Sequence, residues 1–275
     1  MRAISEIKAV VTGGASGLGF ATAKAIIDGG GKVMLFDINQ TQGDIAQDQL
    51  GKNATFIKVD ITQEVEVDEA FAQSVKEMGE VNLTVNCAGI APSKRVLGRD
   101  GVMSTEEFSK VTTINLNGTF TVARAAANVM QHNLFAGGEG NTRDVDDVIE
   151  VDRNDSLYKN ERGVIINTAS IAAFDGLIGQ AAYSASKAGI VGMTLPLARE
   201  FARIGVRVVT IAPGLFRTPL FDTLPEKAVA ALEEGTPFPS RLGDPAEYAA
   251  MVCHIFQNNM MNGETIRLDG ALRMS

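Results

Sequence analysis

Residues 9–19 have the sequence AVVTGGASGLG, and this stretch decides the fold. Its apolar start predicts a short buried strand, and the glycines predict a turn. Apolar residues then recur at helical spacing from Phe20 to Ile27, so the turn joins a strand to a helix. Glycines let the backbone approach a pyrophosphate closely, and a helix N-terminus favours its negative charge. The spacing G-x-x-x-G-x-G differs from the usual G-x-G-x-x-G fingerprint, so the turn by itself is a weak signal.

The segment after this helix indicates which dinucleotide suits the turn. Three glycines at 29–31 end the helix, and residues 33–36 form a second apolar strand. Asp37 closes that strand about 20 residues after the turn, where a carboxylate binds a ribose 2′-hydroxyl. The same charge repels a 2′-phosphate. The sequence therefore favours NAD over NADP.

Strands and helices alternate along the rest of the chain. Further strands are predicted at 56–59, 83–85, 163–170, 206–211 and 265–268. Helices are predicted at 63–78, after a capping box of Ser104 and Glu107, from Tyr183 to about 204, and after Asp244-Pro245. This alternation predicts an α/β fold with a Rossmann-type, doubly wound parallel sheet. Because no linker divides the 275 residues, we expect a single domain over 1–275.

Composition excludes several classes of protein. Lys and Arg number 25 against 33 Asp and Glu, a net charge of −8, which argues against a broad nucleic-acid surface. No apolar run approaches the roughly 18 residues of a membrane span. The first strand begins within about ten residues, so we expect no signal or transit peptide and a cytoplasmic protein. The two cysteines and two histidines lack metal-type spacing, so no metal site is expected.

A second stretch, Tyr183-Ser184-Ala185-Ser186-Lys187, points to acid/base chemistry. Positions i and i+4 share one helix face, and a cation beside a tyrosine lowers the phenol pKa from about 10. Most such pairs are a half-buried ring and a solvated charge, so the pair needs support. Ser170 gives it, because it ends a predicted strand at the edge where open α/β sheets bind ligands. Tyr183 is thus a candidate general acid/base.

Weaker signals surround these two stretches. Asp60 and Ile61 follow a strand and are placed to meet an adenine. The small residues of Asn86-Cys87-Ala88-Gly89 would let a cofactor pass over a strand end, although plain turn residues would look the same. Asn115 lies inside a predicted helix, where a polar role and a solvent-facing position are equally compatible with the sequence.

Two segments break the alternation. Residues 137–162 hold eight acidic and four basic side chains and predict a solvated loop insertion at the amino end of the strand that leads to Ser170. That end lies away from the chemistry. Residues 215–239 combine apolar side chains with several prolines and predict a helical lid over the site.

Taken in order along the chain, these motifs resemble those of the short-chain dehydrogenase/reductase family. The motifs are Thr12-Gly13-x-x-x-Gly17-x-Gly19, Asn86-x-Ala88-Gly89, Asn115, Ser170, Tyr183-x-x-x-Lys187 and Pro213-Gly214. Within the family, further stretches are similar to members that act on 3-hydroxyacyl-CoA. Those stretches are 163–170, 179–196, 211–216, 237–248 and 262–271.

The resemblance implies NAD-dependent interconversion of (S)-3-hydroxyacyl-CoA and 3-oxoacyl-CoA, 2-methyl-branched thioesters included, by a homotetramer. It implies that Ser170 polarises the substrate oxygen, Tyr183 exchanges the proton, Lys187 lowers the tyrosine pKa and holds the nicotinamide ribose, and Asn115 supports a water relay. The implied substrate-binding residues are Ser170, Gln180 and Tyr183. The implied cofactor-binding residues are Gly13, Ser16, Gly17, Leu18, Gly19, Asp37, Asp60, Ile61, Asn86, Cys87, Ala88, Gly89, Tyr183, Lys187, Pro213, Leu215, Phe216 and Thr218.

Three readings stay open beside this one. The first two are a 3-oxoacyl-carrier-protein reductase, which Asp37 disfavours because that enzyme uses NADPH, and a broad alcohol or steroid dehydrogenase. The third is a catalytically silent NAD-binding scaffold. For an acyl-CoA substrate, Lys94, Arg95 and Arg99 are candidate phosphate ligands, and a solvated loop explains them equally well.

Overall fold

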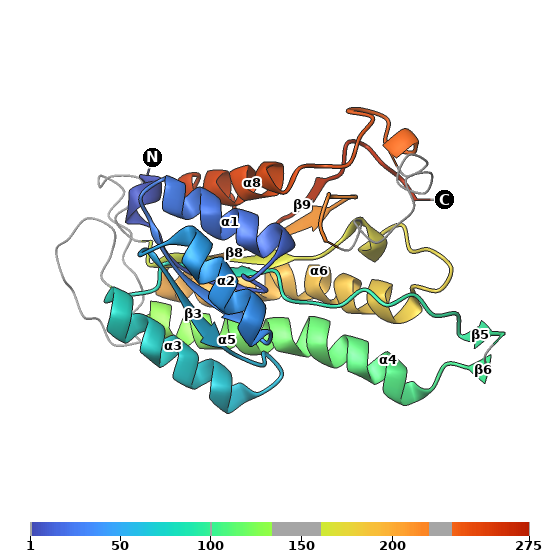
Figure 1. The fold of residues 1–275 in the computed structure, drawn as a ribbon, viewed down its shortest axis with the longest axis horizontal. Coiled ribbons are helices and arrows are strands. Elements are labelled where there is room, and N and C mark those ends of the chain that lie inside the picture. Colours follow the sequence, from blue (N-terminus) through green and yellow to red (C-terminus); the bar gives the residue numbers. More distant parts are fainter. Residues whose placement is uncertain (1, 100, 134–160, 220–232, 275) are drawn as a thin grey trace.

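A computed structural model describes residues 2–99, 101–133, 161–219 and 233–274 (Figure 1). Among these residues a seven-stranded parallel sheet runs in the order β3-β2-β1-β4-β7-β8-β9. Its strands are β1 (Lys8–Thr12), β2 (Lys32–Asp37), β3 (Ala54–Lys58), β4 (Leu83–Asn86), β7 (Gly163–Thr168), β8 (Val206–Pro213) and β9 (Thr265–Leu268). The predicted α/β, doubly wound Rossmann fold is confirmed.

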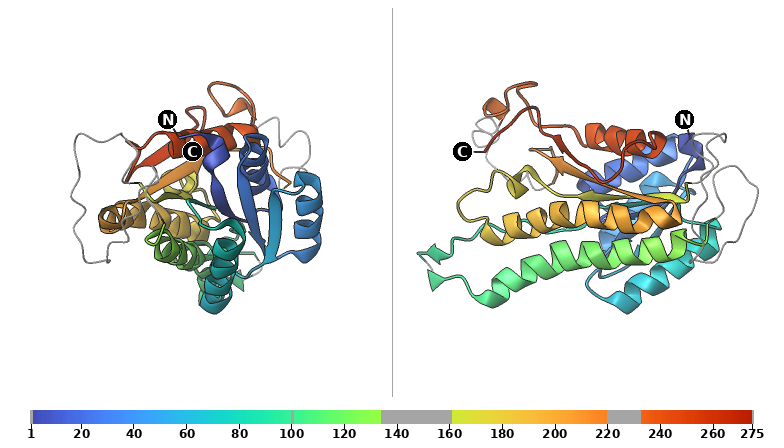
Figure 2. Two further views of the ribbon diagram at one scale, coloured as in Figure 1. Left: turned by 90° about the vertical axis from the view of Figure 1, so that its left-hand side faces the viewer. Right: turned by 180° about the vertical axis from the view of Figure 1, so that it is seen from behind.

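Helices cover both faces of the sheet (Figures 1 and 2). One face carries α1 (Gly17–Asp28), α2 (Gln40–Leu50) and α8 (Pro245–Gln257). The other carries α3 (Glu64–Met78), α5 (Gly118–Met130) and α6 (Ala181–Phe201), and α4 (Thr105–Thr112) extends the line of α5. The expected capping box of α4 is present, and Asp244, the expected cap of α8, forms a capping box with Glu247.

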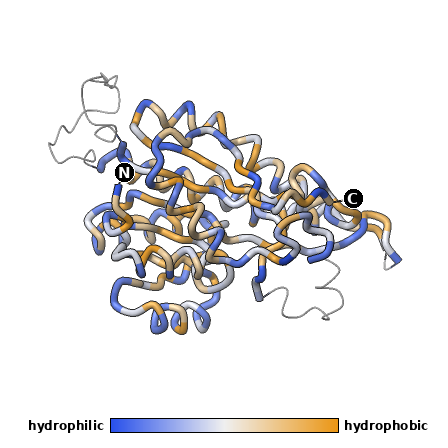
Figure 3. The backbone as a smooth tube through the Cα atoms, turned by 90° about the horizontal axis from the view of Figure 1, so that it is seen from above, coloured by the Kyte–Doolittle hydropathy of each residue, from blue (hydrophilic) through white to orange (hydrophobic). Residues whose placement is uncertain are grey.

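Alternation along the strands divides the core in two. Val10 and Ile165 face the α3 and α5 side, whereas Val11 and Ile166 face the α1 and α8 side. A parallel sheet covered on both faces needs continuous apolar strands, and the apolar parts of the chain accordingly run through the interior (Figure 3). This requirement is why the strands could be predicted.

The strand order creates the position of the site. From β1 the chain moves outward to β2 and β3, then returns to β4 on the other side of β1. The connections after β1 and β4 therefore leave the sheet in opposite directions, which opens a crevice at their carboxyl ends. Thr12, Asn86 and Asn167 lie side by side in register at that edge.

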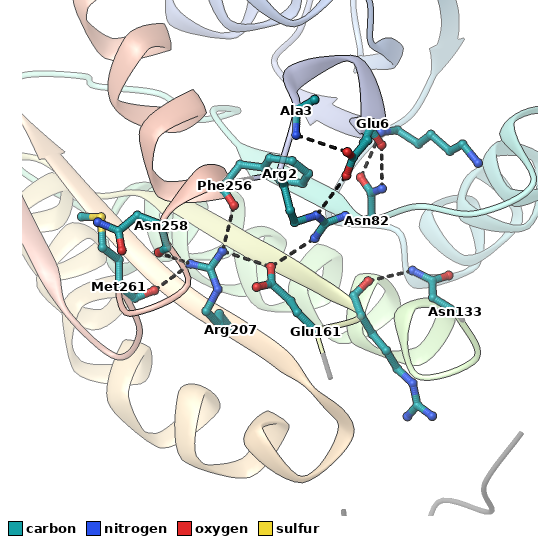
Figure 4. Close-up of polar contacts among 12 residues, drawn as sticks. Arg2, Ala3, Glu6, Asn82, Asn133, Glu161, Arg207, Phe256, Asn258 and Met261 are labelled. Atoms are coloured by element: carbon teal, nitrogen blue, oxygen red, sulfur yellow. Dashed lines mark hydrogen bonds and ion pairs between the residues drawn. The ribbon is translucent and has the colours of Figure 1, made fainter. Parts of the chain in front are cut away.

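The amino end of β7 differs from the prediction of a solvated acidic segment. Glu161 and Arg162 are both buried, and Glu161 accepts hydrogen bonds from Arg2 (3.2 Å) and Arg207 (3.0 Å) (Figure 4). Arg2 also lies over the ring of Phe256, 4.2 Å from its centroid. The charge of Glu161 suggested a position in solvent. Its ion pairs with two arginines on neighbouring elements instead allow it to be buried. Residues 137–160 of the predicted insertion lie outside the described residues.

Two further segments frame the site end of the molecule. Of the predicted lid, residues 220–232 lie outside the described residues, and the flanking 215–219 and 233–239 are described. The strands β5 (Leu97–Gly98) and β6 (Gly101–Val102) form a hairpin that projects beyond the start of α4 (Figure 1). Among the described residues, no helix has the length and apolar character needed to cross a membrane.

Candidate active site

A cavity of 1410 Å³ opens where the carboxyl ends of the central strands meet. Most of the residues predicted to form the site line it. They are Gly13, Ser16, Gly17, Leu18, Gly19, Asp37, Asp60, Ile61, Cys87, Ala88, Gly89, Ser170, Tyr183, Lys187, Pro213, Phe216 and Thr218. The predicted residues that do not line it are Asn86, Asn115, Gln180 and Leu215. Each of these four has a place behind or beside the cavity wall.

The glycine turn after β1 is packed too closely to admit side chains. Gly13 has a φ of +62°, and a Cβ there would lie 2.9 Å from the backbone nitrogen of Ala88. A Cβ on Gly19 would lie 2.2 Å from the carbonyl oxygen of Gly13. Since α1 begins at Gly17, its first amides lie at the cavity wall, as a pyrophosphate cradle requires.

Asp37 sits at the end of β2 beside this turn. Its Oδ2 accepts a hydrogen bond from the amide of Ala15 (3.2 Å), and its Oδ1 accepts one from Asn39 (3.0 Å). The carboxylate therefore lies against the turn and faces the cavity. Among the described residues the cations that line the cavity are Lys110 and Lys187, and neither follows β1 or β2. A ribose hydroxyl fits this corner better than a phosphate does.

Asn86, the last residue of β4, lies next to the cavity without lining it. Its side chain is buried and donates a hydrogen bond to Oδ1 of Asn167 (2.9 Å). The hydroxyl of Thr12 accepts a bond from the amide of Ala88 (3.2 Å). These bonds hold the start of the loop after β4 at the strand end, so its next residues reach the cavity.

Ser170, Tyr183 and Lys187 come together on the opposite wall. Ser170 follows β7, and its Oγ accepts a hydrogen bond from the amide of Ala172 (3.1 Å). Lys187 Nζ lies 5.8 Å from the centroid of the Tyr183 ring and donates to the carbonyl oxygen of Thr168 (2.8 Å). The i, i+4 spacing on α6 thus places both side chains in one cavity with the serine.

The electrostatics of this wall differ from the prediction. Burial raises the pKa of Tyr183, and a hydrogen bond with Ser170 opposes that rise. Burial also lowers the pKa of Lys187 to about 8, although the nearby Cys87 raises it. The net shift of the Tyr183 pKa is therefore upward, and its lowering by Lys187 stays a prediction. Both groups are shielded from water, desolvation is the largest cause of both shifts, and the ammonium is bound to the Thr168 carbonyl.

Asn115 is fully buried, so the solvent-facing alternative is wrong. It lies in a π-helical turn, Thr113–Asn117, between α4 and α5. Its Oδ1 accepts a hydrogen bond from the Ile90 amide (2.8 Å), and its Nδ2 donates to the Ile90 carbonyl (2.8 Å) and to Ser186 Oγ (3.0 Å). Asn115 therefore joins the loop after β4 to the residue before Lys187.

The remaining predicted residues lie outside the cavity wall. Gln180 is the residue before α6, and Leu215 lines a second, smaller cavity together with Phe216. Lys94, Arg95 and Arg99 do not line the cavity, and Lys94 forms an ion pair with Glu107.

Sequence reasoning missed a polar group behind the cavity. Tyr248 of α8 is fully buried, and its hydroxyl lies 2.7 Å from Thr168 Oγ1 and 3.7 Å from Cys87 Sγ. Burial raises the pKa of the Cys87 thiol. Thr168 had a signal, since it lies two residues before Ser170 and thus on the same side of the predicted strand 163–170. Tyr248 had none. The described residues hold no cluster of potential metal ligands.

A cavity that joins a dinucleotide cradle to an acid/base group is what a Rossmann-fold oxidoreductase requires, and this is the class that the fold and the site define. Comparison with known proteins gives the family. A family model described as short chain dehydrogenase matches residues 8–141 and 152–228. The chain belongs to the short-chain dehydrogenase family, whose members are oxidoreductases that use a nicotinamide dinucleotide.

Individual relatives match over nearly the whole chain. A rat protein named 3-hydroxyacyl-CoA dehydrogenase type-2 is 48% identical, over 100% of this chain and 98% of its own. Ipsdienol dehydrogenase from Ips pini is 32% identical, over 96% of both chains. The crystal structure of 3-hydroxyacyl-CoA dehydrogenase type-2 from Mycobacterium avium superposes with a TM-score of 0.85 at 35% identity, over 97% of this chain and 96% of that one.

Proposed function

We propose that this protein is an NAD-dependent dehydrogenase that interconverts (S)-3-hydroxyacyl-CoA and 3-oxoacyl-CoA thioesters, 2-methyl-branched ones among them. One observation carries the proposal: Ser170, Tyr183 and Lys187 line the same cavity as the glycine turn and Asp37. The substrate class is taken from the relatives named 3-hydroxyacyl-CoA dehydrogenase type-2, which match the chain over nearly its whole length.

The glycine turn supports a dinucleotide site. Side chains at Gly13 or Gly19 would clash with neighbouring backbone, so only glycines allow this tight turn beside the cavity. Asp37 supports NAD over NADP, since it offers an acceptor to a hydroxyl and repels a phosphate. Gly89 supports the path of the cofactor, because a Cβ there would lie 3.0 Å from Asn115 Oδ1 and 3.6 Å from Lys187 Nζ. When bound, the cofactor supplies the hydride to a ketone or accepts it from an alcohol.

Tyr183 moves the proton. Its raised pKa keeps the phenol protonated at neutral pH, so it can donate to the carbonyl oxygen of a 3-oxoacyl group. In the reverse direction the phenolate accepts the alcohol proton. Ser170 donates a hydrogen bond to the same oxygen and orients it toward Tyr183. Lys187 would hold the nicotinamide ribose. Asn115 holds the loop after β4 in place through Ile90, and α6 next to Lys187 through Ser186.

The test is a set of initial rates. NADH and NADPH oxidation should be followed with acetoacetyl-CoA, its 2-methyl derivative and a free ketone such as acetoacetate. The proposal expects NADH to be preferred and the thioesters to have the higher kcat/KM. A preference for NADPH would contradict the role of Asp37, and equal rates with thioester and free ketone would contradict the substrate class.

A dehydrogenase of free alcohols is the second candidate. The observation in its favour is that Lys94, Arg95 and Arg99, the candidate ligands for CoA phosphates, do not line the cavity. One relative, ipsdienol dehydrogenase, is named for an alcohol substrate. The same rate panel separates the two candidates, because a free-alcohol enzyme gains nothing from the CoA part.

We also propose that the protein is a homotetramer. Exposed apolar side chains on α4, α5 and α6, namely Phe108, Phe120 and Leu195, support an interface on that side. Light scattering after size-exclusion chromatography tests this, and a monomer at micromolar concentration would contradict it.

A further inference from the structure

Arg267 of β9 is the centre of a group of ionic and aromatic contacts that no catalytic step uses. Its Nη2 donates to Asp175 Oδ2 (2.6 Å) and its Nε to Asp269 Oδ2 (2.7 Å). Its guanidinium also lies over the ring of Phe174, 5.2 Å from the centroid, and Nη2 donates to the carbonyl oxygen of Leu272 (3.0 Å). The side chains of Arg267 and Asp175 are 21% and 18% exposed, so the ion pair is partly shielded from water.

Asp175 and Phe174 belong to the loop 170–180, which joins β7 to α6 (yellow in Figure 1). Ser170 is held at its start by the Ala172 amide and by β7. The outer part of the loop carries exposed apolar side chains at Phe174, Leu177 and Ile178. Any restraint on this outer part therefore acts beside the catalytic serine and not on its own hydrogen bond.

The C-terminal segment 267–272 also contacts the other walls. The amide of Gly214, a cavity-lining residue, donates to the carbonyl oxygen of Leu268 (2.9 Å), and a Cβ on Gly214 would lie 2.9 Å from Asp269. The amide of Phe238, whose side chain is 82% exposed, donates to the carbonyl oxygen of Gly270 (3.3 Å). The segment thus connects the 170–180 loop, the turn after β8 and the base of the predicted lid.

We propose that Arg267, held by Asp269, is a positioning residue that fixes the outer part of the 170–180 loop relative to Phe238, and so sets the fit of the acyl chain. Phe174, Leu177, Ile178 and Phe238 do not line the cavity itself. They are exposed apolar side chains outside it, and in this proposal an acyl chain too long for the cavity lies against them. This inference rests on the proposed function for the nature of the substrate. The loop restraint itself does not.

The experiment compares Asp175→Asn, which keeps the shape of the side chain but removes its charge, with Asp175→Glu, which keeps the charge. Asp68→Asn is the matched control, because Asp68 pairs with Arg124 (2.7 Å) on helices away from this segment. KM and kcat are measured with acetoacetyl-CoA and with 3-oxodecanoyl-CoA, together with the KM for NADH. Amide hydrogen exchange of residues 171–179 is followed in the same variants without substrate.

For Asp175→Asn we expect the KM for 3-oxodecanoyl-CoA to rise about tenfold and that for acetoacetyl-CoA about twofold, with kcat and the KM for NADH within about twofold of wild type. Asp175→Glu should recover most of the loss, and Asp68→Asn should show none. Amides 173–175, which bond to Ser170 and Ile171, should exchange faster only in Asp175→Asn.

Equal changes with both thioesters, or a matching rise in the KM for NADH, would overturn the positioning role. Unchanged exchange in Asp175→Asn would overturn the restraint. If the wild-type protein reduces neither thioester, the proposed function fails, and the exchange experiment still decides whether Arg267 restrains the loop.

Discussion

Replacing Lys187 with methionine should stabilise the folded protein at neutral pH while removing an ammonium from the active site. Lys187 is buried, and burial lowers its pKa from 10.5 to about 8. Methionine has a similar length and no charge, so it fills the same space without the desolvation cost. A residue that weakens the fold is expected where the charge serves chemistry.

The magnitude follows from that pKa. Between about pH 8 and 10.5 the unfolded chain binds the proton more tightly than the folded one, so wild-type stability rises with pH through this window. Below about pH 8 both states are protonated, and the folded state carries the full cost, about 3 kcal/mol. Methionine also loses the hydrogen bond to the Thr168 carbonyl, worth about 1 kcal/mol. The variant should therefore be about 2 kcal/mol more stable near pH 7, and this advantage should vanish near pH 10.

Urea unfolding at about pH 7 and about pH 10 measures this difference, with the exposed Lys52→Met as the matched control. The control should show no pH-dependent gain. The reasoning is refuted if Lys187→Met is less stable than wild type at pH 7, or if the difference between the two proteins does not change with pH.

Three further predictions concern other parts of the molecule. Tyr183→Phe should remove nearly all turnover and leave NADH binding, measured by fluorescence titration, within a few-fold, because only the proton donor is lost; activity within tenfold of wild type would contradict its role. Asp37→Ala should weaken NAD binding and reduce discrimination against NADP, and an unchanged ratio of the two kcat/KM values would place the ribose elsewhere. Glu161→Gln leaves Arg207 buried without its carboxylate and Arg2 with the more distant Glu6 (3.8 Å), and should cost about 3 to 5 kcal/mol in unfolding free energy. Its kcat should stay near that of wild type, since the group lies at the amino end of β7.

The strands and their ends could be predicted because both faces of the sheet are covered. That arrangement requires unbroken apolar runs, and residues 33–36 and 164–166 have them. The site residues that follow such runs, Asp37 and Ser170, were placed by the same rule. Helix α2 was not predicted, because only Gly43 and Ala46 of its eleven residues are buried and no apolar periodicity results. Gly43 is needed there because a Cβ would lie 2.2 Å from the ring of Phe56.

Partners distant in sequence could not be predicted. The side chain of Asn115 bonds to Ile90 and Ser186, which lie 25 and 71 residues away, and the sequence gives no sign of either bond. The hydroxyl of Tyr248 meets Thr168 across 80 residues. In both cases the sequence shows the polar side chain, but its hydrogen-bond partner is brought near only by the fold.

Sequence spacing also predicts which polar side chains lie close together, but not how burial changes their pKa values. The spacing of Tyr183 and Lys187 correctly predicts that both lie on one helix face. The expected lowering of the tyrosine pKa, however, requires a lysine that is protonated without a large desolvation cost. The same burial that shields the pair makes both the ammonium and the phenolate costly. Glu161 shows the opposite outcome, because its charge suggested solvent and two arginines hold it in the interior. The sign of an electrostatic effect therefore depends on burial and on partners, which the strand order and helix packing decide.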